Sequence, residues 1–321
     1  MSALLLLKFS DKNKKSGIVM KKTKLLISNN ENVSGYIFIS PWIICFFSFI
    51  LIPMIYSLFI SFSRYDLIGS PVWNGLKNYV FLITKDKRFL KSVKITIFYV
   101  LVAVPLRLAF SLIIAMILNK KHKLIGFYRA VYYLPSIIGT SVAVAVVWRM
   151  LFGVNGIINK VTALFGYKTQ ISLIANEHTA IWIIILLYMW QFGSSMLIFL
   201  AGLKNIPEMY YESAVVEGAG FWSKFFHITI PLLSPIIFFN LIMQIIHGFL
   251  MFTPAFIITE GGPYDTTRVY ALYMFNRAFQ FYDMGGASAM AWMLLLLIAV
   301  VTGFIFKSSR YWVYYESKEG K

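Results

Sequence analysis

The chain has 321 residues, of which 59% are hydrophobic and only 13% charged, and its mean hydropathy is +0.72. A soluble domain keeps about 25% of its residues charged, so this composition excludes an ordinary soluble protein. Apolar runs of about 20 residues, the length that spans about 30 Å of hydrocarbon, recur along the chain. We expect an all-α membrane protein.

The net charge is +17, from 30 Lys and Arg against 13 Asp and Glu. A strongly basic chain first suggests nucleic-acid binding, but here the basic residues flank apolar runs. That placement is typical of membrane topology signals and of contact with anionic lipid headgroups. Membrane lipid is therefore an expected partner and nucleic acid is not. Cys45 is the only cysteine, so no disulfide forms within the chain.

Six apolar spans are expected in a transmembrane domain over residues 35–310. Residues 1–34 are polar and lysine-rich, and we expect a disordered, cytoplasmic tail there, with a second cytoplasmic tail over 311–321. Placing both termini inside puts more Lys and Arg on the cytoplasmic side, as the positive-inside rule requires. The six spans cover residues 35–62, 92–118, 127–151, 178–203, 228–258 and 288–307.

The only sizeable cytoplasmic loop after the tail covers residues 204–227 and separates the fourth and fifth spans. Asn205 followed by Glu208 resembles a capping box, and Pro207 suits a first helical turn. These residues predict a short helix over 207–216. Gly218 and Gly220 should end it, because glycine adopts the left-handed conformation at little cost.

This loop resembles the EAA signature of ABC importer permeases, in which Glu-Ala-Ala, three residues and Gly are followed by a spacer and Ile-x-Leu-Pro. Ser213 stands in place of the first alanine and Ile230 in place of the leucine. The matching positions here are Glu212, Ser213, Ala214, Gly218, Ile228, Ile230 and Pro231.

The resemblance implies a type I importer fold in which this loop forms a coupling helix that docks on a separate ATP-hydrolysing subunit. It implies that Glu212 and Ala214 lie at that contact, that Gly218 makes the turn, and that Pro207 and Glu217 border the helix. The chain is then a permease and not an enzyme, and ATP and Mg are held by the partner. A helix that lies on the membrane surface without a partner is the alternative for this loop.

Other stretches resemble the carbohydrate-uptake branch of the same family. Residues 129–135 look like the start of its third span and residues 148–159 like the end of that span. The external stretch 259–267, with Gly261-Gly262-Pro263, resembles the maltose-importer F-subunit type. The resemblance implies a sugar or oligosaccharide as substrate and a second, unlike permease. It also implies an extracytoplasmic sugar-binding protein and the cytoplasmic membrane of a prokaryote.

Several kinds of chemistry have no signature in the sequence. It lacks the Gly-x-x-x-x-Gly-Lys-Ser/Thr phosphate loop, and its four histidines show no metal-ligand spacing. All 13 acids fall outside the expected spans, so a relay of buried carboxylates, common in secondary transporters, is not expected. The alternatives to an ABC permease are a secondary transporter or channel that is not coupled to ATP, and a membrane scaffold.

Two polar faces suggest a route for substrate through the membrane. On the fifth and fourth spans, polar residues recur at i, i+4 (or i+3) and i+7, which places each set on one helical face. They supply hydroxyl-matching groups beside an aromatic ring, as a sugar requires, although hydrogen-bonded contact between helices explains the same spacing. The residues are Asn240, Gln244 and His247, and Tyr188, Gln191 and Ser195.

Arg107 lies near the middle of the second span, where a charge costs about 2.5–3.5 kcal/mol on insertion scales. The spans contain no acid that could pair with it. The sequence leaves three partners open: an acid on the second permease, backbone carbonyls around a kink at Pro105, or an anionic group on the substrate. The third alternative would make the substrate an acidic sugar.

Overall fold

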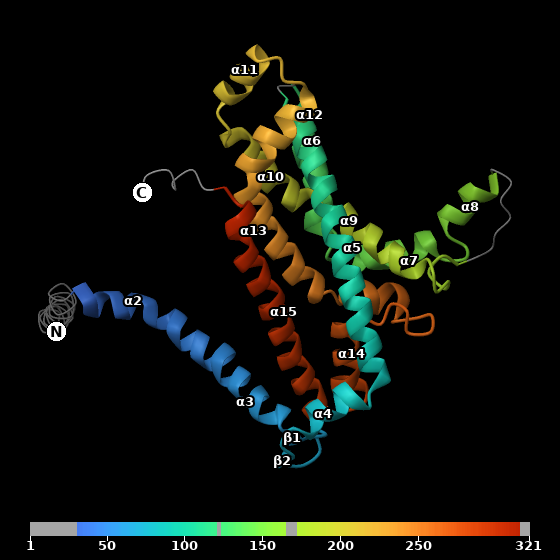
Figure 1. Ribbon diagram of the computed structural model, residues 1–321. Helices are drawn as coiled ribbons and strands as arrows, with labels where there is room; N and C mark the ends of the chain where they lie inside the picture. The colour runs from blue at the N-terminus through green and yellow to red at the C-terminus, as the bar shows by residue number, and fades with distance from the viewer. Residues whose placement is uncertain (1–30, 121–122, 165–171, 315–321) are drawn as a thin grey trace, which may run out of the picture. The chain divides into compact units, whose positions relative to one another are not determined.

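The computed structural model describes residues 31–120, 123–164 and 172–314, and nearly all of its regular structure is helical (Figure 1). The predicted tail over residues 1–34 lies almost wholly outside the described residues, as does most of the one over 311–321. The chain divides into two units, residues 1–59 and 60–321. In the first unit, α2 (Glu31–Phe46) continues through a π-helical turn, η1 (Phe47–Leu51), into α3 (Ile52–Ser61), whose last two residues belong to the second unit.

The second unit is a helical bundle with one small two-stranded sheet, in which Ser63 pairs with Trp73. The short elements labelled η are π-helical turns. In chain order the elements are β1 (Ser63–Arg64), β2 (Val72–Trp73), α4 (Lys77–Thr84), α5 (Lys87–Leu118), α6 (Ile125–Ile138), α7 (Val142–Phe152), α8 (Ile157–Leu164), α9 (Ala180–Trp190), α10 (Gly193–Asn205), α11 (Glu208–Val216), α12 (Phe221–Lys224), η2 (Phe225–Thr229), α13 (Ile230–Phe249), η3 (Ala255–Thr259), α14 (Tyr270–Phe275), η4 (Asn276–Gln280) and α15 (Met284–Trp312).

The expected number of spans agrees with the structure. Five helical stretches in the described residues are long and apolar enough to cross a membrane, and the bent pair α9 and α10 makes a sixth when it counts as one span. The five stretches cover residues 35–61, 87–118, 142–164, 221–249 and 284–312.

Three of the expected spans, the third, fourth and fifth, differ from the single helices that hydropathy suggested. The third, expected over 127–151, is interrupted at residues 139–141, where the Ser141 side chain accepts a hydrogen bond from the amide of Val144 and begins α7. The fifth ends at Phe249 rather than near residue 258, because Met251 and Phe252 are not helical and separate α13 from η3.

The fourth span bends by 43° between α9 and α10. Gly193 begins α10 against the backbone of α6, where an added Cβ would lie 2.5 Å from the carbonyl oxygen of Tyr132. No other residue fits so close an approach, so this glycine allows the start of α10 to pack against the middle of α6.

Helix α5 is the centre of the bundle and packs against α9, α10, α13 and α14. Its 32 residues form one continuous helix although Pro105 removes a backbone donor. Fully buried apolar side chains from several helices fill the core around it, among them Tyr99, Val104, Met196, Leu233 and Met290.

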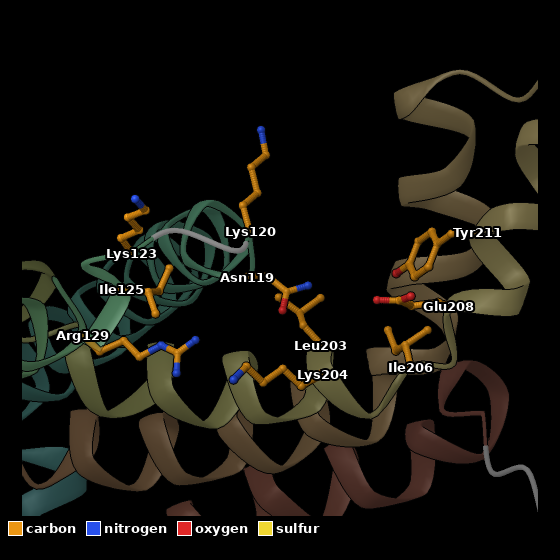
Figure 2. Close-up of a pocket in the computed structure, with 10 residues that line it drawn as sticks. All are labelled: Asn119, Lys120, Lys123, Ile125, Arg129, Leu203, Lys204, Ile206, Glu208 and Tyr211. Carbon is orange, nitrogen blue, oxygen red and sulfur yellow. The ribbon is translucent and has the colours of Figure 1, made fainter. Parts of the chain in front are cut away.

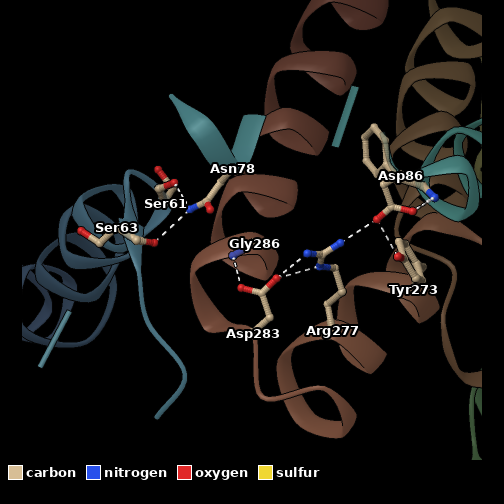
Figure 3. Close-up of polar contacts among 9 residues, drawn as sticks. Ser61, Ser63, Asn78, Asp86, Tyr273, Arg277, Asp283 and Gly286 are labelled. Atoms are coloured by element: carbon tan, nitrogen blue, oxygen red, sulfur yellow. Dashed lines mark hydrogen bonds and ion pairs between the residues drawn. The ribbon is translucent and has the colours of Figure 1, made fainter. Parts of the chain in front are cut away.

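Three elements are tied together at the end of the bundle where α5 and α15 begin (Figure 3). Arg277, in η4, pairs with the N-cap carboxylates of both helices: its Nη1 lies 2.6 Å from Asp86 Oδ2, and it also bonds Asp283. Each carboxylate accepts a hydrogen bond from a free amide in the first turn of its own helix, that of Phe89 at 3.0 Å and that of Gly286 at 2.8 Å. One guanidinium therefore joins two helix starts.

The Tyr273 hydroxyl donates to Asp86 at 2.6 Å. Burial, together with the hydrogen bond to that carboxylate, raises the pKa of Tyr273 to about 12. The phenol therefore stays protonated and keeps donating at physiological pH.

We predict that Arg277→Ala lowers the free energy of unfolding by about 3–5 kcal/mol, because it leaves the buried carboxylate of Asp86 and the partly exposed carboxylate of Asp283 without their cation. Arg88→Ala is the matched control, since Arg88 pairs with Asp265 through a side chain that is 61% exposed and such pairs contribute about 0–1 kcal/mol. Thermal unfolding of the two purified variants measures the difference. Equal shifts would show that the junction contributes little.

Candidate functional site

A cavity of about 410 Å3 lies where the broken spans meet. Its walls come from α5, α6, α7, α9, α10 and α13, from the break at residues 139–141 and from the segment after α13. The lining residues are Arg107, Ser136, Gly139, Thr140, Ser141, Ala145, Tyr188, Gln191, Ser194, His247, Leu250, Met251, Phe252, Thr253 and Pro254. Hydroxyl, amide and aromatic groups thus face one space inside an apolar bundle.

The carbonyl groups at the bend in the fourth span accept hydrogen bonds from side chains of α5 and α6. The carbonyl oxygen of Gln191 accepts from Ser136 Oγ at 2.9 Å and from Arg107 Nη2 at 2.5 Å. The next carbonyl, of Phe192, keeps a helical donor, the Met196 amide at 3.0 Å, and also accepts from Ser111 Oγ at 3.1 Å. Side chains of α5 and α6 therefore satisfy the Gln191 carbonyl, which the bend leaves without a helical amide donor.

Gln191 itself reaches across to the other broken span. Its side-chain Nε2 donates to the carbonyl oxygen of Gly139 at 2.9 Å, and the Ser194 amide donates to Ser136 Oγ at 3.0 Å. The two breaks are hydrogen-bonded to one another, so the cavity has walls with a defined geometry.

Arg107 is 6% exposed and its guanidinium lies over the Tyr188 ring, 4.4 Å from the ring centroid. This is a cation–π distance. The Nη2 atom also donates to Ser194 Oγ at 3.3 Å, whereas Nε has no acceptor within the described part of the chain. Of the three partners left open, the structure includes a backbone carbonyl, but it is that of Gln191 and does not lie at a kink around Pro105.

The residues of the two predicted polar faces separate into two groups. Tyr188, Gln191 and His247 line the cavity together with Arg107. The remaining three, Ser195, Asn240 and Gln244, lie outside its lining and are buried at 0%, 0% and 4% exposure.

Hydrogen bonds between helices occupy part of the buried group. The Tyr188 hydroxyl donates to Gln244 Oε1 at 2.9 Å, and Gln244 Nε2 donates to Ser195 Oγ at 3.0 Å. The amide of Asn240 has no partner among the described residues.

Several cavity residues with hydroxyl groups lie outside the two predicted polar faces, among them Ser136, Thr140, Ser141 and Ser194. A signal was present in the sequence, since Ser136, Gly139, Thr140 and Ser141 form a small polar cluster inside an expected apolar span. Such a cluster marks either a break or a polar wall, and here it is both.

The second candidate site is the loop between α10 and α13. Helix α11 covers Glu208–Val216, close to the prediction, but no capping box begins it: Asn205 ends α10, and the N-cap is Pro207, without a side-chain bond. Glu212 is exposed on α11, Ala214 is half-buried, and Glu217 is the C-cap.

The end of α11 forms a Schellman motif. The Ala219 amide donates to the carbonyl oxygen of Ala214 at 2.8 Å, and the Gly218 amide donates to that of Val215 at 2.9 Å. Gly218 has a φ of +77°, as predicted. Gly220 differs from the prediction, because it is extended, with φ −73° and ψ 175°, and starts α12.

Beside α11 lies a second cavity of about 750 Å3, shown in Figure 2. Arg129 and Lys204 are directed toward one another along one wall, and Glu208 and Tyr211 of α11 face them. The lining of this cavity is therefore mainly basic.

Comparison with known proteins gives a consistent result. Residues 26–310 match the family described as binding-protein-dependent transport system inner membrane component. The chain is 53% identical over 302 residues to the probable ABC transporter permease protein YesP of Bacillus subtilis (strain 168), covering 94% of this chain and 97% of that protein. It is 30% identical over 285 residues to the arabinooligosaccharides transport system permease protein AraP of the same organism, covering 87% and 90%.

Solved structures share the fold. A chain of a bacterial ABC transporter involved in the import of the acidic polysaccharide alginate superposes with a TM-score of 0.77 at 21% identity, covering 89% of this chain and 98% of that one. A bacterial alginate ABC transporter in complex with an alginate pentasaccharide-bound periplasmic protein gives 0.76 at 20% identity, covering 87% and 95%. The chain therefore belongs to the binding-protein-dependent inner-membrane components of ABC transporters and has the helical permease fold of type I importers.

Proposed function

We propose that the chain is the permease subunit of an ATP-driven importer for a sugar or oligosaccharide. The observation that carries this proposal is the polar cavity, where hydroxyl, amide and imidazole groups converge beside Tyr188 and Phe252 within a family of importer permeases. A saccharide needs such donors and acceptors, with aromatic surface for its apolar face. The names of the sugar-transporting relatives, such as AraP, support the same substrate class.

Helix α11 is proposed as the coupling helix. It carries large apolar side chains in the open, with Met209 64%, Val215 58% and Val216 89% exposed. Such exposure at the end of a bundle is typical of a surface that a partner covers. We assign that partner as an ATP-hydrolysing subunit holding ATP and Mg, which places α11 and both termini in the cytoplasm.

The complete importer requires two further partners in this proposal, a second, unlike permease and an extracytoplasmic sugar-binding protein. The structural match to a permease solved with a periplasmic protein supports an external docking partner. Membrane lipid surrounds the bundle, and the membrane is the cytoplasmic membrane of a prokaryote.

The proposed function is tested by reconstituting the whole complex into liposomes and measuring uptake of labelled oligosaccharides. We expect uptake that requires ATP and the binding protein, and that stops when the ATPase subunit carries an inactivated nucleotide site. Uptake that continues with the inactive ATPase would instead favour a transporter that is not coupled to ATP.

Coupling is tested at Gly218. We predict that Gly218→Ala loses most substrate-stimulated ATP hydrolysis and transport, because a side chain at φ +77° costs about 1–2 kcal/mol and loosens the end of α11. Gly220→Ala is the matched control, since Gly220 is extended and a Cβ at either position meets no atom within 4 Å. Wild-type coupling in the Gly218 variant would contradict the assignment.

Residues that line the cavity should differ from those that join helices. We predict that Gln244→Leu lowers stability by about 1–2 kcal/mol with little change in the KM for uptake, since Gln244 bonds Tyr188 and Ser195 behind the cavity wall. His247→Ala should raise the KM with little change in stability, because the imidazole is exposed in the cavity. Thermal unfolding and uptake kinetics of both variants separate the two roles, and the opposite pattern would reverse them.

A further inference from the structure

The cavity contains a buried positive charge with no negative charge beside it. None of the residues that line it is Asp or Glu, and none of the ion pairs in the described part of the chain includes Arg107. The groups that bind Arg107 Nη2, a carbonyl and a hydroxyl, are neutral. The site therefore keeps a full unit of positive charge in a place shielded from water.

Holding the fourth span in its bent form does not require this charge. The carbonyl oxygen of Gln191 already accepts from the hydroxyl of Ser136, and the neighbouring carbonyl of Phe192 accepts from the hydroxyl of Ser111. A neutral donor at position 107 would satisfy the same acceptor at a lower cost of desolvation. Hydrogen bonding at the break therefore does not explain why position 107 carries a positive charge.

The guanidinium is also held in a defined plane. The Tyr188 ring lies under it at 4.4 Å, Nη2 donates to Gln191 and Ser194, and Nε is enclosed by the protein without an acceptor among the described residues. These contacts leave Nη1 as the donor for a ligand, and a carboxylate that accepts from it would form a charge-assisted hydrogen bond. Hydroxyl groups of Thr140 and Ser141 and the His247 imidazole line the same space, as a saccharide that carries the carboxylate would require.

We propose that the transported saccharide bears a carboxylate, as in a uronate-containing oligosaccharide, and that Arg107 binds this group in the cavity. The proposal rests on the proposed function, because it names the class of sugar for the same site. It makes Arg107 the residue that distinguishes acidic from neutral saccharides within this chain.

The test is calorimetric binding to the assembled permease–ATPase complex without its binding protein, so that selectivity reflects the membrane subunits alone. The probes are a uronate trisaccharide and the same trisaccharide with its carboxyl groups reduced to alcohols. We expect the wild-type complex to prefer the acidic probe. Arg107→Gln should weaken binding of that probe about 30-fold or more, the lower range for losing one partner of a buried charge pair, and should change binding of the neutral probe little.

Two further variants complete the design. Thr140→Ala removes an uncharged cavity hydroxyl and should affect both probes equally. Arg107→Lys keeps the charge but not the planar fork, so it should retain part of the acidic preference, and it serves as the test if the glutamine variant fails to assemble. In that case the proposal is wrong if neither the wild-type complex nor the Arg107→Lys complex prefers the acidic probe.

The outcomes distinguish the proposal from the function on which it rests. If the wild-type complex imports neutral saccharides and Arg107→Gln weakens both probes equally, the carboxylate proposal is wrong and sugar import stands. If the complete importer transports neither probe nor any other saccharide, the proposed function itself fails.

Discussion

Every backbone carbonyl inside a membrane needs a hydrogen-bond donor from the protein, and the site depends on this constraint. The bend in the fourth span leaves the carbonyl of Gln191 without a helical amide donor, whereas the carbonyl of Phe192 still accepts from the Met196 amide. Arg107 and Ser136 donate to the Gln191 carbonyl from α5 and α6, and Ser111 adds a second donor at Phe192. A polar lining inside an apolar bundle is therefore a consequence of the bend, and the cavity exists because two broken spans satisfy each other's backbone.

The sequence allowed prediction of those features that depend on local chemistry. The apolar lengths gave the number of spans, and glycine at position 218 gave the left-handed end of α11, since both follow from residues next to one another in the chain. The breaks could not be predicted in the same way, because hydropathy averages over about 20 residues and is insensitive to a single freed carbonyl. The contact that brings the bent span against α6, Gly193 against the Tyr132 carbonyl, joins residues 61 positions apart.

The polar residues show why helical spacing alone could not identify the lining. Tyr188 and Ser195 would lie on one face only if one continuous helix joined them. The 43° bend between α9 and α10 lies between the two residues, so their side chains point in different directions. Ser195 is therefore turned away from the cavity toward Gln244, to which it is hydrogen-bonded. Asn205 was misassigned for a related reason: it fits a cap in the sequence, but packing extends α10 through it and leaves Pro207 to begin α11.

The cavity and the proposed coupling helix lie at opposite ends of α10. This helix begins at Gly193, beside the cavity residues Gln191 and Ser194, and it ends at Asn205, two residues before α11. At 1.5 Å per residue its 13 residues span about 20 Å. Only Ile206 and Pro207 separate it from α11, and Ile206 is 7% exposed and packed in the core. No flexible linker therefore separates α11 from the hydrogen bonds around Gln191. A displacement of α11 would be transmitted through α10 to the bend, and the bend would pass it to the cavity.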